Sequence, residues 1–224
     1  MKIVAIQSSP KKKNSNTLKL IEAALEGARE AGAETELIDL TKFNLNFCKG
    51  CVTCYRDGTC HQKDDYNALK EKIVSADGII ISSPNYIDNV TAQLKVFLDR
   101  SANFIHEQLL DGKYGLSLTT SGSGNDDFVL GILNHFITAS GGMLTGKGVG
   151  CGIGQGPAAL EASVKKAHAA GKELVSAIKS KKVYPDQVAA HKAWKEHFAM
   201  TVTRNKDNWK HNYEYWLEKG WLKA

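Results

Sequence analysis

The 224-residue sequence lacks any run of about 18 apolar residues, the length that a membrane-spanning helix needs. Its first ten residues, MKIVAIQSSP, hold too short an apolar stretch for a signal peptide. Neither sign of charge dominates, because 29 Lys and Arg stand against 24 Asp and Glu, and the basic residues are spread along the chain. These absences predict a cytoplasmic protein that binds neither a membrane nor nucleic acid.

Several catalytic motifs are missing too. The sequence contains no HExxH pair and no GxSxG nucleophile elbow. Residues 141–148 come near the phosphate-binding pattern GxxxxGK[ST], but glycine follows the lysine, and the segment precedes or enters a predicted strand. Residues 154–159, GQGPAA, lack the acidic partner of a dinucleotide-binding fingerprint. A kinase and a Rossmann-fold dehydrogenase are therefore poorly supported, and no catalytic residue is assigned.

Strand and helix patterns alternate over the first 180 residues. The run GIIIS at 78–82 is apolar throughout, as in parallel strands that are covered on both faces. The alternation indicates an open parallel sheet with helices on both faces. Strands are predicted at 2–7, 34–40, 78–82, 114–119 and 143–149. Helices are predicted from 16 or 17 to the glycine at 32, and at 65–76, 89–104, 127–139 and 157–178.

From about residue 183 the composition becomes rich in aromatic residues. All four tryptophans lie there, and helical patterns occur near 186–202 and 206–219. We therefore predict a main domain at 1–182 and a helical C-terminal extension at 183–224. Its aromatic side chains are expected to pack against the main domain or a second subunit, or to cover a neighbouring active site.

Three loops follow strands at the edge where open α/β sheets bind ligands: 8–17, 83–89 and 119–124. The first, SSPKKKNSNT, offers hydroxyls, amides and three lysines, and it runs into a helix N-terminus. Free N–H groups and the helix dipole favour an anion there, so the loop suits a phosphate monoester. The same groups also suit a solvated turn that caps the helix, and both interpretations stay open.

Segments around these loops carry a family resemblance. KIVAIQSSPKKKNSNT is similar to a phosphate loop written GSPRxxxNT, with Ser8 in place of glycine and Lys11 in place of arginine. ADGIIISSPNYIDNVTAQLKVFLDR is similar to a flavin loop written SPxYxxxxxxxLKxFxDR. Over about residues 1–180 the chain resembles the flavodoxin-like NAD(P)H-dependent FMN reductases. The resemblance implies a flavodoxin-like α/β fold with a five-stranded parallel sheet of order 2-1-3-4-5.

The resemblance also implies a binding site for FMN. The 5′-phosphate is expected among Ser9, Lys11, Asn14, Ser15, Asn16 and Thr17. The isoalloxazine ring is expected against Pro84, Asn85, Tyr86 and Asn89. The third loop is expected to complete the pocket with Thr120, Ser121, Gly122 and Gly124.

Four of the five cysteines, Cys48, Cys51, Cys54 and Cys60, form CxxCxxCxxxxxC within 13 residues. Such clusters in reducing compartments indicate metal or redox chemistry more often than structural disulfides. The spacing resembles the iron–sulfur flavoproteins, a branch of the same superfamily, which implies a [4Fe–4S] cluster beside FMN. Relatives similar to the plain reductases carry a CxGCxxC segment without a cluster, so free or disulfide-bonded thiols are the alternative. A zinc site is chemically feasible but less typical of this spacing.

The expected function is an FMN-dependent oxidoreductase. NAD(P)H, as co-substrate, passes a hydride to the flavin, and electrons go on to a small-molecule or protein acceptor, through the iron–sulfur cluster where there is one. A homodimer or homotetramer is expected, because a second subunit can cover the flavin at its open rim. The alternatives are an electron carrier without enzymatic activity and a cysteine-based redox or metal sensor.

Overall fold

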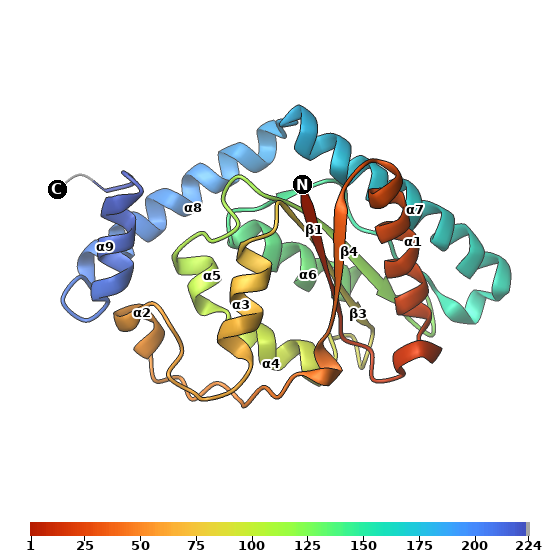
Figure 1. The fold of residues 1–224 in the computed structure, drawn as a ribbon, viewed down its shortest axis with the longest axis horizontal. Helices are drawn as coiled ribbons and strands as arrows, with labels where there is room; N and C mark the ends of the chain where they lie inside the picture. The colour runs from red at the N-terminus through yellow and green to blue at the C-terminus, as the bar shows by residue number, and fades with distance from the viewer. Residues whose placement is uncertain (223–224) are drawn as a thin grey trace.

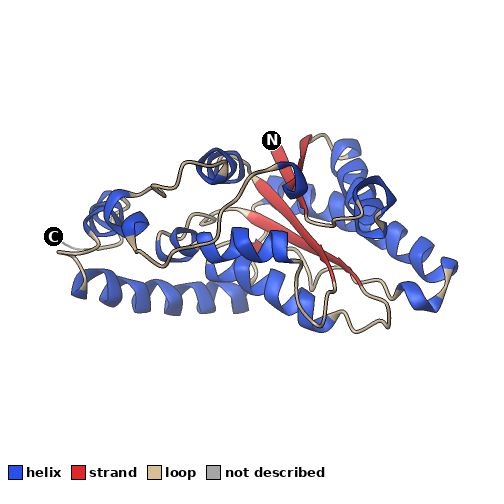
Figure 2. Cartoon of the chain, turned by 90° about the horizontal axis from the view of Figure 1, so that it is seen from below, coloured by secondary structure: helices blue, strands red, loops and turns tan. Residues whose placement is uncertain are grey.

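The structure, a computed structural model, describes residues 1–222. Five parallel strands form one sheet in the order β2-β1-β3-β4-β5, which confirms the predicted strand order. The strands are β1 (Lys2–Gln7), β2 (Glu34–Asp39), β3 (Gly78–Pro84), β4 (Tyr114–Thr120) and β5 (Met143–Leu144). Figures 1 and 2 show this sheet between layers of helices. The fold is therefore a doubly wound, flavodoxin-like α/β sandwich.

Each face of the sheet has its own hydrophobic core. On one face lie α1 (Asn16–Glu30) and α7 (Pro157–Ser180), which run side by side. Gly27 and Gly171 allow the two helices to approach closely. A Cβ at either position would come within about 2 Å of a carbonyl oxygen of the other helix. The other face is covered by α3 (Tyr66–Val74), α4 (Ala92–Arg100), α5 (Ala102–His106) and α6 (Asp127–Ala139).

Three predicted elements differ in the structure. The helix expected at 89–104 is two helices, α4 and α5, separated by Ser101, whose hydroxyl donates to the Phe97 carbonyl at 2.7 Å. The strand expected at 143–149 stops at Leu144, because the following loop uses positive φ angles at Gly146 and Gly148. The cysteine segment, for which no strand or helix was predicted, contains the short helix α2 (Thr53–Asp57). Each difference follows from a local turn that the hydrophobic pattern does not encode.

The C-terminal extension consists of α8 (Pro185–Arg204) and α9 (Lys210–Glu218). Helix α8 leads away from α7 to the far side of the molecule, where α9 packs against α2 (Figure 1). Phe198, Val202 and Trp216 form a small core of their own. The division into a main domain and an extension at residue 183 stays a prediction.

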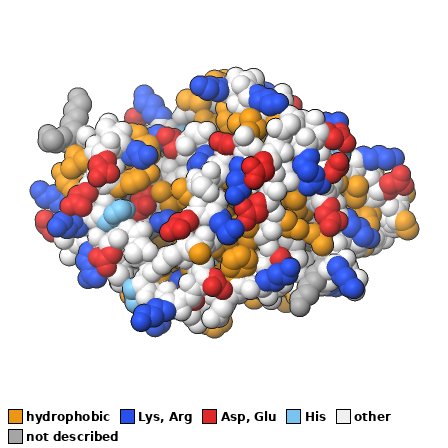
Figure 3. Space-filling view, in the orientation of Figure 1, with side chains coloured by type: hydrophobic (Ala, Val, Ile, Leu, Met, Phe, Trp, Pro, Cys, Tyr) orange, Lys and Arg blue, Asp and Glu red, His pale blue; other side chains and the backbone are white. Residues whose placement is uncertain are grey.

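Charges of both signs are interspersed on the face shown in Figure 3. Among the described residues, no helix combines the length and the apolar character that crossing a membrane requires.

Candidate functional site

A cavity of about 340 Å³ opens at the carboxyl ends of the strands, and we call it the strand-end cavity. Its volume falls in the range of about 300–1,000 Å³ that is typical of ligand pockets. It is lined by Ser9, Lys11, Ser15, Asn16, Thr17, Pro84, Asn85, Tyr86, Thr120, Ser121, Gly122, Ile153 and Gly154. The three loops predicted from the sequence therefore meet in one place.

The first loop is fixed to the sheet and to helix α1. The Ser8 hydroxyl donates to the Ser82 carbonyl at 2.8 Å, and the Thr91 hydroxyl donates to the Ser8 carbonyl at 3.1 Å. Ser15 is the N-cap of α1, since its hydroxyl accepts from the Leu18 N–H at 3.2 Å. The helix thus begins at the cavity, with the positive end of its dipole directed there.

A buried pair of hydroxyls joins the first loop to the third. Thr17 Oγ1 and Thr120 Oγ1 lie 2.6 Å apart, and both residues are almost fully buried. This contact ties the first turn of α1 to the end of β4. The cavity therefore has a polar floor that is held rigidly before any ligand arrives.

The second loop is a tight turn that keeps Tyr86 at the cavity rim. Tyr86 and Asn89 exchange backbone hydrogen bonds of 2.9 and 3.2 Å, and Ile87 and Asp88 between them have positive φ angles. Tyr86 is 44% exposed, so its ring is both part of the lining and open to solvent.

Two lining residues, Ile153 and Gly154, were missed by the sequence analysis, which considered residues 154–159 only as a dinucleotide-binding fingerprint and rejected it. Their backbone N–H groups donate to the Ser121 and Gly122 carbonyls at 2.8 and 2.9 Å. A Cβ at Gly154 would lie 2.4 Å from the Gly122 oxygen, so the close contact of the two loops requires glycine. The signal was present, because this glycine-rich loop follows the fifth strand and must reach the same edge of the sheet.

Three predicted residues lie outside the cavity lining. Asn14 and Asn89 are exposed, and Gly124 supports the third loop by donating its N–H to the Ser121 hydroxyl at 2.8 Å. Asn14 closes a turn in the first loop through its N–H bond to the Lys11 carbonyl at 3.0 Å. Among the described lining residues there is no Asp, Glu, His or Cys, so the cavity offers binding groups rather than an acid–base pair.

The four clustered cysteines line a second, small cavity of about 70 Å³. They belong to a segment that we call the cysteine loop, residues 46–64. All five cysteines are free thiols, and Cys151 is buried apart from the other four. His61, next to Cys60, has Nδ1 3.7 Å from Cys51 Sγ.

Within the described part of the chain, no three His, Cys, Asp or Glu side chains are arranged to hold one metal ion. Thiolates around a cubane cluster bind different irons and stand farther apart than thiolates around a single ion. Four cysteines that share one cavity can therefore serve as ligands of a cluster without being arranged around a single ion.

The thiols of the loop differ in acidity. Burial, together with the charge of nearby Cys60, raises the pKa of Cys54 to about 11. The Thr53 hydroxyl, which donates to Cys51 Sγ at 3.3 Å, lowers the pKa of Cys51. Metal binding to such thiols releases protons and is therefore favoured at higher pH.

The base of the cysteine loop is closed by a buried ion pair between Arg100 and Asp64. Asp64 also accepts from the Asn46 N–H at 2.8 Å and the Tyr66 N–H at 3.2 Å. Burial raises the pKa of Asp64, but the Arg100 guanidinium and these N–H donors outweigh it and hold the pKa at about 2. The two ends of the loop, at 46 and 64, are thereby joined to each other and to α4.

The back of the loop rests on aromatic side chains. The rings of Tyr55, His106 and Trp209 contact one another, with centroids 4.5 Å apart for Tyr55–His106, 4.7 Å for Tyr55–Trp209 and 5.1 Å for His106–Trp209. The Asn103 amide donates to the Cys54 carbonyl at 3.0 Å. Because Trp209 precedes α9, the C-terminal extension takes part in holding helix α2.

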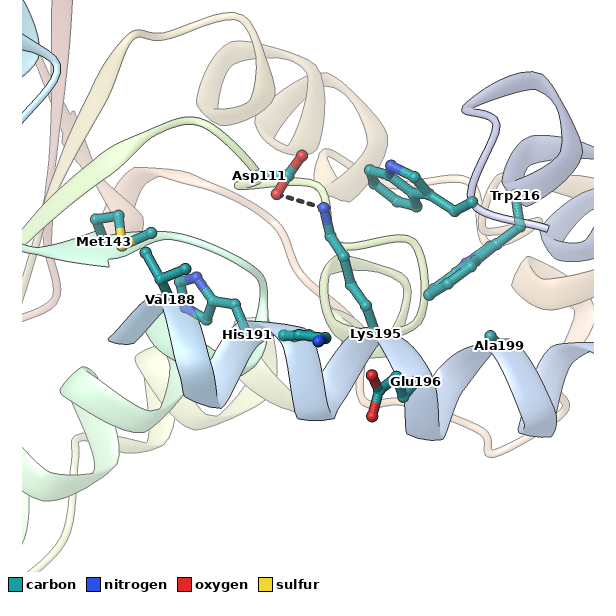
Figure 4. A pocket seen from close by; sticks show the side chains of 10 residues that line it. Asp111, Met143, Val188, His191, Lys195, Glu196, Ala199 and Trp216 are labelled. Atoms are coloured by element: carbon teal, nitrogen blue, oxygen red, sulfur yellow. Dashed lines mark ion pairs between the residues drawn. The ribbon is translucent and has the colours of Figure 1, made fainter. Parts of the chain in front are cut away.

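A third hollow, of about 430 Å³, lies where α8 and α9 meet the main domain (Figure 4). Two of its charged groups form an ion pair, since Lys195 Nζ lies 2.8 Å from the Asp111 carboxylate, and Lys195 Nζ also lies 4.1 Å from the centre of the Trp221 ring. None of the predicted site residues lines it.

Comparisons with known proteins find relatives that cover most of the chain. The profile of a family described as NADPH-dependent FMN reductase matches residues 1–156. An iron–sulfur flavoprotein of Archaeoglobus fulgidus is 35% identical over 224 residues, covering 99% of this chain and 100% of that protein. An iron–sulfur flavoprotein of Methanosarcina thermophila is 40% identical over 126 residues, 56% of this chain and 65% of that protein.

Among solved structures, a flavone reductase superposes with a TM-score of 0.65 at 21% identity, covering 80% of this chain and 63% of that one. At this identity the similarity shows a shared fold and no more.

Proposed function

Since this chain belongs to the NADPH-dependent FMN reductase family and to its iron–sulfur flavoprotein branch, we propose that it oxidises NAD(P)H with FMN held in the strand-end cavity. The family makes the chain an FMN-dependent flavoprotein of the oxidoreductase class. The observation that carries the assignment of the site is that one cavity gathers three separate loops, with all but two of its lining residues expected from the flavin motifs.

The phosphate end of the site is assigned to the first loop. Hydroxyls of Ser9, Ser15 and Thr17 and the start of α1 supply several hydrogen-bond donors, and Lys11 supplies a positive charge. Asn16 lines the cavity at the first residue of α1, whereas Asn14 acts through the turn that it closes. Such an array suits a phosphate monoester, which has several acceptor oxygens to satisfy.

The ring end is assigned to the other loops. Pro84, Asn85 and Tyr86 form one side, and Asn89 holds the Tyr86 turn in place. Thr120, Ser121 and Gly122 form the other side, supported by Gly124. A Cβ at Gly122 would meet no atom within 4 Å, so this position leaves open space for a flat ring.

When bound, FMN supplies hydride acceptance and one-electron transfer, which side chains do not offer. The protein residues therefore bind and orient rather than exchange protons, consistent with a lining free of acids and histidines over its described residues. NAD(P)H is expected to approach from the exposed side, beside Tyr86.

For the cysteine loop we propose that Cys48, Cys51, Cys54 and Cys60 hold a [4Fe–4S] cluster. Their spacing and their shared cavity support this, and all four are free to ligate. Electrons would leave through this loop to a small-molecule or protein acceptor. The loop suits that role, since Cys48 and Cys51 are exposed.

We also propose a homodimer or homotetramer. Two large apolar side chains close in sequence to the cavity loops stand exposed: Ile87, next to Tyr86, is fully exposed, and Phe128, four residues after the third loop, is 58% exposed. A second subunit that covers them would also shield the flavin. Light scattering coupled to gel filtration gives the subunit number directly.

The enzymatic proposal is tested by mixing FMN-loaded protein anaerobically with NADPH or NADH. Oxidation of either nucleotide with many turnovers in the presence of an artificial acceptor supports it. Tightly bound FMN without nucleotide oxidation would instead identify an electron carrier.

The cluster proposal is tested with Cys51→Ser, which should lose iron while keeping FMN. Cys151→Ser is the matched control, because it removes a thiol outside the loop and should keep both. Iron retained in Cys51→Ser at the wild-type level would contradict the ligand assignment.

A further inference from the structure

Arg100, the last residue of α4, reaches one of the clustered cysteines directly. Its guanidinium Nη2 donates to Cys60 Sγ at 3.2 Å. The same group binds the Asp64 carboxylate and the Asn46 carbonyl, the latter at 3.3 Å, and lies 4.4 Å from the centre of the Tyr66 ring. A single guanidinium therefore joins a cysteine sulfur to both ends of the cysteine loop.

This contact is shielded from water. Arg100 is only 4% exposed, and its Nε is buried with no hydrogen-bond partner among the described residues. Arg100 also lines the cavity that the four cysteines share. A buried charge acts more strongly than an exposed one because neither water nor salt screens it. Asp64 balances part of the charge, but the N–H that points at Cys60 places the positive end of the pair against the sulfur.

We infer that Arg100 is a positioning residue that raises the reduction potential of the cluster through its hydrogen bond to Cys60 Sγ. The inference rests on the proposed function, since it needs the four cysteines to hold a cluster. Adding one electron increases the negative charge beside the guanidinium, so the N–H···S bond and the buried cation stabilise the reduced form more than the oxidised form. Removing the contact should make reduction harder.

The test compares Arg100→Gln and Arg100→Lys with Arg56→Gln. Arg56 is the matched control: it lies in the same loop and pairs with Asp57 at 2.8 Å, but its side chain is 62% exposed and no hydrogen bond joins it to a cysteine. FMN fluorescence quenching checks that each variant is folded. Iron and sulfide are counted per chain, and the cluster is then titrated potentiometrically with visible and electron paramagnetic resonance spectra.

We expect wild-type FMN binding in all three variants, a lower midpoint potential in Arg100→Gln, and an unchanged one in Arg56→Gln. Arg100→Lys keeps a charge and a donor, so its potential should lie between those of wild type and Arg100→Gln. Equal potentials in wild type and either Arg100 variant would overturn the inference.

Loss of iron from both Arg100 variants, with FMN and the Arg56→Gln cluster intact, would also overturn the inference. It would show that the role of Arg100 is to close the loop. Wild-type protein that takes up no iron would be a different failure, that of the proposed function itself.

Discussion

The strand-end cavity is shaped by residues that directly follow buried strands, whereas the cysteine loop is shaped by residues far away in the sequence. In the cavity, Ser8, Thr17 and Thr120 are held by hydrogen bonds to strands or first helical turns. The cysteine loop has only a five-residue helix of its own and depends on Arg100 and on Trp209 from the C-terminal extension. The strand-end cavity is thus positioned by the ends of the strands, and the cysteine loop by contacts with residues that are distant in the sequence.

The strongest test of this contrast is Asp64→Ala, which leaves Arg100 buried without its partner. Breaking a buried ion pair costs about 3–5 kcal/mol, so the free energy of unfolding should fall by that amount. Asp57→Ala, which breaks the exposed pair with Arg56, should leave it nearly unchanged, because water screens that pair. Urea denaturation measures both, and equal losses would show that the base of the loop is not a clamp.

A second test concerns Glu107, which is buried behind the cysteine loop. Its Oε2 lies 3.9 Å from Lys70 Nζ, its Oε1 lies 3.7 Å from His211 Nε2, and Asn103 is beside it. Burial, opposed by the charge of Lys70, raises the pKa of Glu107 from 4.5 to about 7.

Between these two pH values the unfolded chain has lost the proton and the folded chain retains it, so the free energy of unfolding falls as pH rises. Glu107→Gln removes the titrating carboxyl group and with it this fall in the free energy of unfolding. The variant should match wild type below pH 4.5 and exceed its stability by roughly 1–3 kcal/mol above pH 7. Parallel stability profiles of the two proteins across this range would refute the assignment.

In the cavity, Gly154→Ala should weaken FMN binding about tenfold, or about 1.4 kcal/mol, because its Cβ would push against the Gly122 carbonyl. Gly131→Ala on α6, where a Cβ meets no atom within 4 Å, is the control and should leave the affinity unchanged. Iron content should be the same in both variants, since the cysteine loop is held independently. Fluorescence titration with FMN gives the dissociation constants.

The smallest effect is expected for Lys11→Gln. Lys11 lines the cavity but is exposed, so its attraction for a phosphate should be worth about 0.5–1 kcal/mol, or roughly two- to fivefold in the dissociation constant at low salt. High salt should shrink the difference. Lys13→Gln, in the same loop but outside the lining, should have no effect at either salt concentration.

The contrast also explains which features of the fold and of the two sites could be predicted from the sequence. The strands and the position of the three loops at their carboxyl ends were predicted from local signals, apolar runs followed by Ser, Asn and Gly, whereas the strand order was implied by the family resemblance. The cysteines were found by their spacing. The clamp between Arg100 and Asp64, and the tilted ring contact between Tyr55 and Trp209, join residues 36 and 154 positions apart, and no local pattern encodes such pairs. The break at Ser101 was missed because apolar residues continue across it.

The central claim, two separately built redox sites in one chain, is tested most directly by chemical analysis of protein purified without oxygen. The account predicts one FMN and four iron atoms per chain in wild type, and one FMN without iron in Cys54→Ser. A wild-type chain that binds no FMN, or a Cys54→Ser chain that retains all its iron, would contradict it.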